Sequence, residues 1–312
     1  MSIIDMHCDT IYKLMADESI GLRENNISID LKKLKKANSK AQFFAMFIDK
    51  SEHSNVLKRF YSMVDKFLIE IHKNKDYISL AKNYNEMNEN FLQDKISAFL
   101  TIEEGAALEG NIENLEKFYD LGVRLITLTW NYPNEIGYPN TQENYMKNGL
   151  TEFGIEVVEK MNKLGMIIDV SHLSDEGFYD VAKYSNKPFV ASHSDARFIK
   201  NHPRNLTDHM IKILSESGGV MGINFSSNFL GNSKVSKIED MITHIKHIKN
   251  VGGIDCIAIG TDFDGIGNEV EIKDFGEMDK LVISLEKNSF SQGEIEKILN
   301  KNAERVIKDT LK

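Results

Sequence analysis

Histidine and carboxylate side chains stand at the ends of five short apolar segments that lie far apart in the 312-residue chain. These ends read His7-Cys-Asp9, Glu103-Glu104, Ser171-His172, Ser192-His193 and Thr261-Asp262-Phe-Asp264. Imidazole and carboxylate ligands suit zinc or another divalent first-row metal. One bridging carboxylate between two histidine-containing half-sites can hold two ions about 3.5–4 Å apart, a pair that generates hydroxide at neutral pH and polarises a carbonyl. The residue types therefore predict a two-metal hydrolytic site.

Each fragment taken alone also has a structural interpretation. A single His-x-Asp sequence, or a single histidine at the end of a strand, is more often a hydrogen-bonded core residue than a metal ligand. Five such ends together are different, because a buried site lined with unpaired polar groups costs free energy unless it binds a ligand. The combination therefore favours a metal site.

The remaining histidines and the two cysteines are expected to be structural. His244 and His247 share one face of a lysine-containing helix and are interpreted as solvated surface residues. Cys8 and Cys256 are interpreted as small buried hydrophobic residues. The glycine-rich stretch 260–267 lacks the spacing of a phosphate loop, so we assign it no nucleotide-binding role.

Eight apolar segments have the length and the bounding residues of β-strands. They are Ser2–Asp9, Ala41–Asp49, Ile96–Glu103, Val123–Trp130, Met166–His172, Phe189–His193, Gly219–Phe225 and Cys256–Asp262. Helix-periodic segments lie between most of them, namely Asn55–His72, Ile112–Leu121, Thr151–Leu164, Asp175–Tyr184, Thr207–Ser217 and Ser236–Lys249. Strands that alternate with helices indicate a parallel sheet.

Eight such units favour closure into a (β/α)8 TIM-type barrel, although an open doubly wound sheet has a similar local pattern. We expect one catalytic barrel domain over residues 1–312, with residues 291–312 as a C-terminal helical extension packed on the outside of the barrel. The carboxyl ends of barrel strands converge on one face, the face on which catalytic residues lie. This convergence brings the five polar strand ends together.

Alternation along the strands predicts which side chains share a face. Successive strand residues point to opposite faces, so His7 and Asp9 point the same way while Cys8 points away. Asp5 lies on the face of His7 and is expected to orient a ligand. Glu103 and Glu104 point in opposite directions, and periodicity leaves open which of them faces inward.

The composition excludes several classes of protein. The formal net charge of −9 and a pI near 5.6 argue against a nucleic-acid-binding protein and against a polybasic membrane-surface protein. No stretch approaches the ~20 consecutive apolar residues of a transmembrane helix. The N-terminus has no charged and apolar regions of a secretory signal. Together with only two cysteines, these features predict a cytoplasmic protein.

Seven motifs in this order make the chain resemble the membrane dipeptidase (renal dipeptidase) family, and the resemblance spans nearly the whole chain. The motifs are His7-Cys-Asp9, Ile102-Glu103-Glu104-Gly105, Leu121-Gly-Val-Arg124 running into Leu128-Thr-Trp130, Asp169-Val-Ser-His172, Ser192-His193-Ser-Asp-Ala, Arg204-Asn205-Leu206 and Gly260-Thr-Asp262-Phe-Asp-Gly265. No single motif is decisive, but seven in sequence are specific.

The resemblance implies a binuclear zinc dipeptidase that acts on free dipeptides, including those with a C-terminal D-residue. By this resemblance His7 and Asp9 bind one zinc, His172 and His193 bind the second, and Glu103 bridges them. The resemblance also implies that a metal-bridging hydroxide would attack the scissile carbonyl. It implies that Asp262 would take a proton from the bridging water and pass it to the leaving amine, and that Arg204 would bind the terminal carboxylate of the substrate. Relatives are often homodimers, so a homodimer is a further expectation.

One departure from the family pattern affects the substrate site. Where many members carry a histidine after the Leu-Thr of the fourth strand, this chain has Trp130, followed by Asn131. Tryptophan offers a single N–H donor and cannot accept a proton. Either Trp130, Asn131 or a metal ion takes over the role of that histidine, or the substrate differs. The alternatives are a two-metal amidohydrolase that cleaves another amide or an ester, and a metal-binding homologue without turnover.

Overall fold

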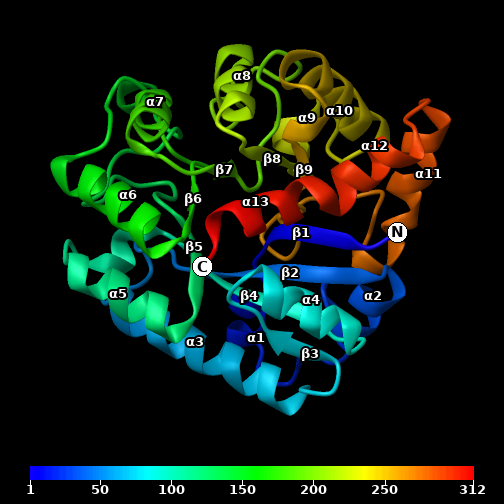
Figure 1. The fold of residues 1–312 in the computed structure, drawn as a ribbon, viewed down its shortest axis with the longest axis horizontal. Helices are drawn as coiled ribbons and strands as arrows, with labels where there is room; N and C mark the ends of the chain where they lie inside the picture. The colour runs from blue at the N-terminus through cyan, green and yellow to red at the C-terminus, as the bar shows by residue number, and fades with distance from the viewer.

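Eight parallel strands form a closed barrel in the computed structural model, which describes residues 1–312 (Figure 1). The strands of the ring are β1 (Ile3–Cys8), β2 (Ser39–Phe47), β4 (Ile96–Glu103), β5 (Val123–Thr127), β6 (Ile167–Asp169), β7 (Val190–Ala191), β8 (Val220–Ile223) and β9 (Ile257–Ile259). The ring closes because β1 pairs with both β2 and β9, and β2 pairs with β4. The predicted barrel and its eight strands are thus confirmed.

A ninth strand, which the sequence analysis did not predict, lies beside the ring. Strand β3 (Ile78–Leu80) pairs with the first residues of β4, whose later residues pair with β5. It is three residues long, which is too short for alternation to distinguish it from a loop. It extends the sheet beside the amino-terminal part of β4 and contributes no residue to the site described below.

Helices surround the barrel and supply its outer core. They are α1 (Thr10–Ala16), α2 (Leu31–Lys36), α3 (Val56–Lys73), α4 (Tyr84–Leu92), α5 (Ile112–Leu121), α6 (Glu152–Leu164), α7 (Asp175–Tyr184), α8 (Asp208–Glu216), α9 (Ser227–Leu230), α10 (Ile238–Gly252), α11 (Asp279–Lys287), α12 (Gln292–Glu296) and α13 (Asn302–Thr310). Gly122 and Gly165 end α5 and α6 in the left-handed conformation, which glycine adopts without a Cβ penalty.

Alternation along the strands divides the buried residues into two layers. Outward-facing side chains such as Phe44 and Met46 join the large core beneath the helices, while Ala41 and Phe43 join a smaller cluster inside the ring. Because β2 pairs with β4 without a break in register from Ala41 to Phe47, Phe47 has the inward direction of Ala41 and Phe43. The inner layer thus leads directly to the carboxyl ends of the strands.

The C-terminal segment closes the amino end of the barrel. Helix α12, a π-helical turn over Lys297–Lys301 and α13 follow one another. Ala303, Val306 and Ile307 of α13 pack into the inner cluster, and α13 crosses the middle of the view in Figure 1. Helix α13 of this segment therefore packs on the barrel at its amino end, in contact with the inner cluster. The apolar face of α13 covers the inward side chains and keeps water from the amino end of the barrel.

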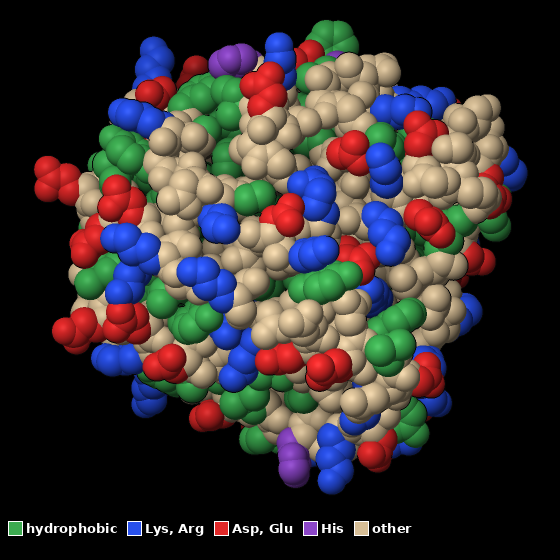
Figure 2. All heavy atoms as spheres, in the orientation of Figure 1, with side chains coloured by type: hydrophobic (Ala, Val, Ile, Leu, Met, Phe, Trp, Pro, Cys, Tyr) green, Lys and Arg blue, Asp and Glu red, His purple; other side chains and the backbone are tan.

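The surface carries charges of both signs. Lys, Arg, Asp and Glu side chains are interspersed over the face in Figure 2, and no basic patch stands out there. None of the helices combines the length and the apolar character that crossing a bilayer would require.

Candidate metal centre

The predicted ligand side chains meet at the carboxyl ends of the strands. His7 lies in β1, Asp9 caps α1 directly after it, and Glu103 is the last residue of β4. His172 and His193 follow β6 and β7 by a few residues. Four strands distributed around the ring therefore supply one buried cluster, which is the arrangement that the barrel geometry predicts.

Glu103 occupies the middle of this cluster. Its Oε2 lies 3.2 Å from His7 Nε2, and its Oε1 lies 3.1 Å from His172 Nε2 and 3.5 Å from His193 Nε2. His7 Nε2 lies 3.5 Å from Asp9 Oδ2. The two oxygens of one carboxylate thus face the two groups of ligands, which is the geometry of a bridging ligand.

The spacing of these donors fits metal ions. Zinc bonds of ~2.0–2.1 Å place the donors of a tetrahedral site about 3.4 Å apart. The separations around Glu103 lie between 3.1 and 3.5 Å, and His172 Nε2 lies 3.1 Å from His193 Nε2. His7 Nε2 and Asp9 Oδ1 are buried and have no hydrogen-bond partner. A Cβ at Gly265 would lie 2.0 Å from Asp9 Oδ2, so glycine keeps this side of the cluster open.

The electrostatics of the cluster also favour bound cations. Burial alone would lower the pKa of His7, but the Glu103 and Asp9 carboxylates outweigh it and raise that pKa well above its usual value. Burial and the charge of Glu103 raise the pKa of Asp9 to about 8. The buried carboxylates of Asp9 and Glu103 repel one another, and a cation between them relieves that repulsion.

Neighbouring side chains fix the orientation of two of the imidazoles. His172 Nδ1 lies 3.1 Å from Asn131 Oδ1, and His193 Nδ1 lies 2.7 Å from Ser192 Oγ. With the proton placed on Nδ1 in each ring, both Nε2 lone pairs point at the cluster. Burial, followed by the charge of Arg204, lowers the pKa of His172 to about 4, so the ring is neutral, which is the form that binds a metal.

Arg204 is a buried cation without a carboxylate partner within ion-pair distance. Its side chain is 3% exposed, with Nη1 3.4 Å from Ser194 Oγ and Nη2 3.2 Å from the His193 carbonyl oxygen. Its Nε has no hydrogen-bond partner. The guanidinium lies 5.1 Å from the ring centroid of Phe229. Buried cations normally have an anionic partner, so this guanidinium beside the cluster is available to an anionic ligand.

Residues 1–312 match the sequence profile of the membrane dipeptidase family, peptidase family M19. The chain belongs to the membrane dipeptidase family. Membership assigns it to the metallo-dipeptidases, a class that depends on a divalent metal. The resemblance predicted from the seven motifs is therefore confirmed.

Individual proteins share the sequence or the fold of this chain. A Klebsiella pneumoniae protein, named uncharacterized protein in pqqA 5'region, is 35% identical over 228 residues, 70% of this chain and 83% of the relative. The crystal structure of the dipeptidase AC, a family M19 metallopeptidase, matches with a TM-score of 0.93 at 24% identity, covering 100% of this chain and 99% of that one. A metallopeptidase from Rhodobacter sphaeroides, liganded with a phosphinate mimic of L-Ala-D-Ala, matches at 0.91 with 23% identity and 99% of both chains. These two structures establish the shared fold.

The backbone of this dipeptidase is strained at the candidate site. His172 and Asp262 have φ angles of 68° and 58°, values that residues with a Cβ rarely adopt. Such conformations cost on the order of 1–3 kcal/mol and persist where the surrounding structure imposes them, often at functional sites. They turn both side chains back over the mouth at the ends of β6 and β9.

The structure resolves the choice between the two adjacent glutamates. Glu103 faces the cluster, whereas Glu104 faces away, with its Oε1 accepting from Ala106 N at 2.9 Å and from Asn134 Nδ2 at 2.5 Å. Glu104 is fully buried and has a φ of 97°. It anchors the turn after β4 in this dipeptidase and does not approach the ligands.

The sequence analysis was wrong about the contacts of Asp5. Asp5 does not contact the His7 ring: its carboxylate accepts from Thr261 N and Oγ1, both at 2.8 Å, and from Gln42 at 2.9 Å. It therefore positions the end of β9, next to Asp262. Cys8 and Cys256 are free and buried, as predicted.

Sequence reasoning missed Asp169, which holds Ser192 and, through it, His193. The carboxylate of Asp169, at the end of β6, accepts from Thr127 Oγ1 at 2.6 Å, Ser192 Oγ at 2.6 Å, Ser192 N at 2.8 Å and Ser171 N at 3.0 Å. It thereby holds Ser192, which contacts His193. The signal was its position in the Asp169-Val-Ser-His172 motif, but its partners come from other strands.

His244 is buried, which contradicts its interpretation as a surface residue. Its Nδ1 accepts from Ala196 N at 3.0 Å and its Nε2 donates to the Leu230 carbonyl at 2.9 Å. His247 is half-buried and pairs with Asp208 at 2.7 Å. His244 therefore ties α10 to the loop that carries Arg204, because a buried polar ring is stable only when both nitrogens are bonded.

We expect this buried histidine to make stability depend on pH. Burial lowers the pKa of His244 to about 4, while its usual value is 6.5. The unfolded chain therefore binds the proton more tightly, so the free energy of unfolding falls as the pH drops from 6.5 towards 4, by on the order of 3 kcal/mol. The free energy of unfolding, measured with urea at several pH values between 4.5 and 7.5, should depend less steeply on pH for His244→Gln than for the native chain. The exposed His209→Gln is the control, and an unchanged slope in His244→Gln would contradict this role.

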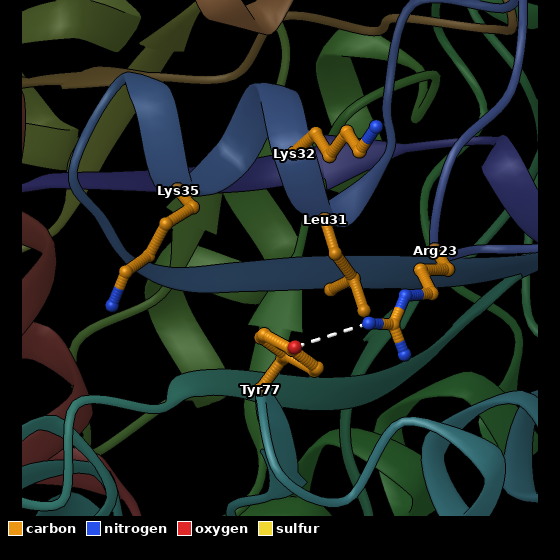
Figure 3. A pocket seen from close by; sticks show the side chains of 5 residues that line it. All are labelled: Arg23, Leu31, Lys32, Lys35 and Tyr77. Carbon is orange, nitrogen blue, oxygen red and sulfur yellow. Dashed lines mark hydrogen bonds between the residues drawn. The ribbon is translucent and has the colours of Figure 1, made fainter.

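A surface cavity of about 270 Å³ lies away from the candidate site (Figure 3). It is lined by Arg23, Leu31, Lys32, Lys35 and Tyr77. Tyr77 directly precedes β3, so the cavity is near the amino ends of the strands. The ammonium groups of its two lysines point away from Tyr77 and pair with Glu24 and Asp94. Their charge is already neutralised, so the cavity offers no comparable binding chemistry.

Proposed function

We propose that this dipeptidase hydrolyses the peptide bond of free dipeptides at a pair of divalent ions, in the first instance zinc. The convergence of five side chains carries this proposal: His7, His172 and His193 lie against the two oxygens of Glu103, and Asp9 lies against His7. His7 and Asp9 would hold one ion, His172 and His193 the other, and Glu103 both. Such a pair of ions supplies an activated water and polarises the scissile carbonyl.

Arg204 is proposed to bind the carboxylate at the C-terminus of the substrate. Its guanidinium is buried, unpaired and adjacent to the carbonyl of His193. A planar guanidinium can donate two parallel hydrogen bonds to a carboxylate, which fixes the direction of the substrate as well as its affinity. A nucleobase or a neutral ester would leave this cation without a partner.

Asp262 is proposed to move the proton between the attacking water and the leaving amine. Its Oδ1 lies 4.0 Å from His7 Nε2, and its Oδ2 accepts from Asn224 Nδ2 at 2.9 Å. The side chain is therefore held at the edge of the cluster with one oxygen free. Burial raises the pKa of this carboxyl, which brings its proton affinity closer to that needed for transfer at neutral pH.

Trp130 and Asn131 are proposed to border the substrate where many relatives have a histidine. The Oδ1 of Asn131 faces His172, so its amide nitrogen remains available as a donor. The indole of Trp130 lies 6.2 Å from the His172 ring, measured between centroids. Asn131 would supply the hydrogen-bond donor, and Trp130 the contact surface, that one histidine provides in those relatives.

The direct test is a release assay with a panel of L,L and L,D dipeptides, alongside elemental analysis of the purified protein. The L,D members belong in the panel because the Rhodobacter sphaeroides structure holds a mimic of L-Ala-D-Ala. Hydrolysis with about two metal equivalents per chain supports the proposal. Loaded metal with no dipeptide cleaved would favour another amide or an ester as substrate, and no hydrolysis of any amide would indicate a metal-binding homologue without turnover.

We expect Arg204→Ala to raise the KM for free dipeptides by about 100-fold, because a charged hydrogen bond to a carboxylate contributes ~1.5–3 kcal/mol. The same dipeptides with an amidated C-terminus should show little change between the native and variant enzymes. Arg23→Ala, on the surface, is the matched control. Equal effects on free and amidated substrates would count against carboxylate binding by Arg204.

We also propose a cytoplasmic location, supported by two buried cysteines that form no disulfide, and a homodimeric state. Chromatography with light scattering on the purified protein would measure the latter.

A further inference from the structure

Four aromatic side chains form a continuous wall on one side of the ligand cluster. Tyr12, Phe47, Trp130 and Tyr132 contact one another in that order, with ring centroids 5.3, 4.8 and 5.8 Å apart. All four are partly exposed, although Phe47 belongs to a strand that is otherwise buried. We call these residues the aromatic wall.

The wall borders the candidate metal centre directly. Phe47 is the last residue of β2 and is paired in register with Glu103 on β4. Both side chains point inward by the alternation of their strands, so the Phe47 ring stands beside the bridging carboxylate. Trp130 follows β5, the other neighbour of β4, and approaches the His172 ring. The wall thus spans the mouth above β2, β4 and β5.

Arg204 lies across this mouth from Phe47. It contacts Ser194 and the carbonyl of His193, which follow β7, and the order of strands around the ring separates β7 from β2 by three strands on either side. The cluster around Glu103 lies between the two. A dipeptide that places its carboxylate at Arg204 and its scissile carbonyl at the cluster must therefore extend its N-terminal residue towards the wall.

We propose that the aromatic wall selects dipeptides whose N-terminal residue has a large apolar or aromatic side chain. The inference rests on the function proposed above and adds the class of substrate. Four rings present mainly carbon to the mouth, with only two phenol hydroxyls and one indole N–H as polar groups. Apolar side chains gain from leaving water against such a surface, and aromatic ones also stack on it, whereas glycine gains nothing and a charged side chain loses hydration.

The test varies the N-terminal residue at a constant C-terminal alanine and measures kcat/KM of the metal-loaded enzyme for Phe-Ala, Leu-Ala, Gly-Ala and Asp-Ala. The native enzyme is expected to prefer Phe-Ala to Gly-Ala by about 10- to 100-fold. Phe47→Ala and Trp130→Ala should each reduce this preference by about tenfold or more, and Phe47→Leu by less. Phe91→Ala, an exposed aromatic residue of α4, is the control that should leave the preference intact.

A second pair, Ala-Phe and Ala-Gly, places the same difference on the C-terminal residue. The ratio of kcat/KM for these two substrates should be unchanged in Phe47→Ala, because the C-terminal residue of the dipeptide lies on the side of Arg204, away from Phe47. A native enzyme that does not prefer Phe-Ala to Gly-Ala overturns the inference, as do losses in the variants that are equal for both substrates. Those results leave the proposed function intact, whereas a metal-loaded native enzyme that cleaves none of the dipeptides overturns the proposed function itself.

Discussion

Glu103→Gln is expected to lose most of its bound metal and to reduce turnover by on the order of a thousandfold or more. The carboxylate of Glu103 faces His7 with one oxygen and His172 and His193 with the other. Glutamine has the same shape, but its amide nitrogen is a donor and cannot coordinate a metal, and the negative charge that offsets the cations is removed. Losing the ions removes both the activated water and the polarised carbonyl.

The measurement is elemental analysis after dialysis, together with steady-state kinetics on one dipeptide. Glu104→Gln is a closely matched control, since it makes the same change one residue later on a side chain that faces Asn134 and Ala106 instead of the cluster. It should retain metal and most of the activity. Full metal content in Glu103→Gln, or an equal loss of metal in Glu104→Gln, would show that Glu103 does not bridge the ions.

The arrangement of the candidate ligands was predictable because it depends on strand ends. His7, Glu103, His172 and His193 each follow an apolar run that reads as a strand, and a parallel barrel brings such ends to one face. The chain order of strands and helices therefore indicated both the fold and the place of the site. Little tertiary information was needed for this step.

Contacts between distant segments were not predictable in the same way. Asp169 binds Ser192 and Thr127, and Phe47 meets Trp130, only because the ring fixes the register of neighbouring strands. His244 lies in a helix with exposed lysines, and its burial depends on the loop that covers it. Periodicity along one segment reports the face of a residue but not its partner on another segment.

The choice between Glu103 and Glu104 shows the same limit at a single position. Adjacent strand residues point to opposite faces, so one of the two glutamates had to face inward. Because both residues are glutamates, the residue types do not indicate which one. The pairing of β4 with β2 fixes the parity, because Glu103 is opposite Phe47 and continues the inward series. Register between strands, rather than residue type, decides which carboxylate meets the ligands.

Asp262→Asn is expected to keep its metal and to lower kcat by about 100- to 10,000-fold, the range for the removal of a positioned proton-transfer group. The substitution preserves the size of the side chain, and the amide oxygen can still accept from Asn224 Nδ2, so the turn after β9 should remain in place. The proton acceptor is lost, however, because an amide does not take up a proton at neutral pH. KM should change much less than kcat.

Asp264→Asn separates this chemical role from a structural one. Asp264 follows the same strand, but its carboxylate accepts from Thr10 Oγ1 at 2.8 Å and from Ser28 N at 2.7 Å, away from the ligand cluster. It should lower thermal stability and leave kcat close to native. If both variants lose kcat to the same extent with metal retained, the effect of Asp262 comes from the fold of this loop. If only Asp262→Asn loses kcat, the carboxylate that Asn224 holds beside His7 is the group that moves the proton.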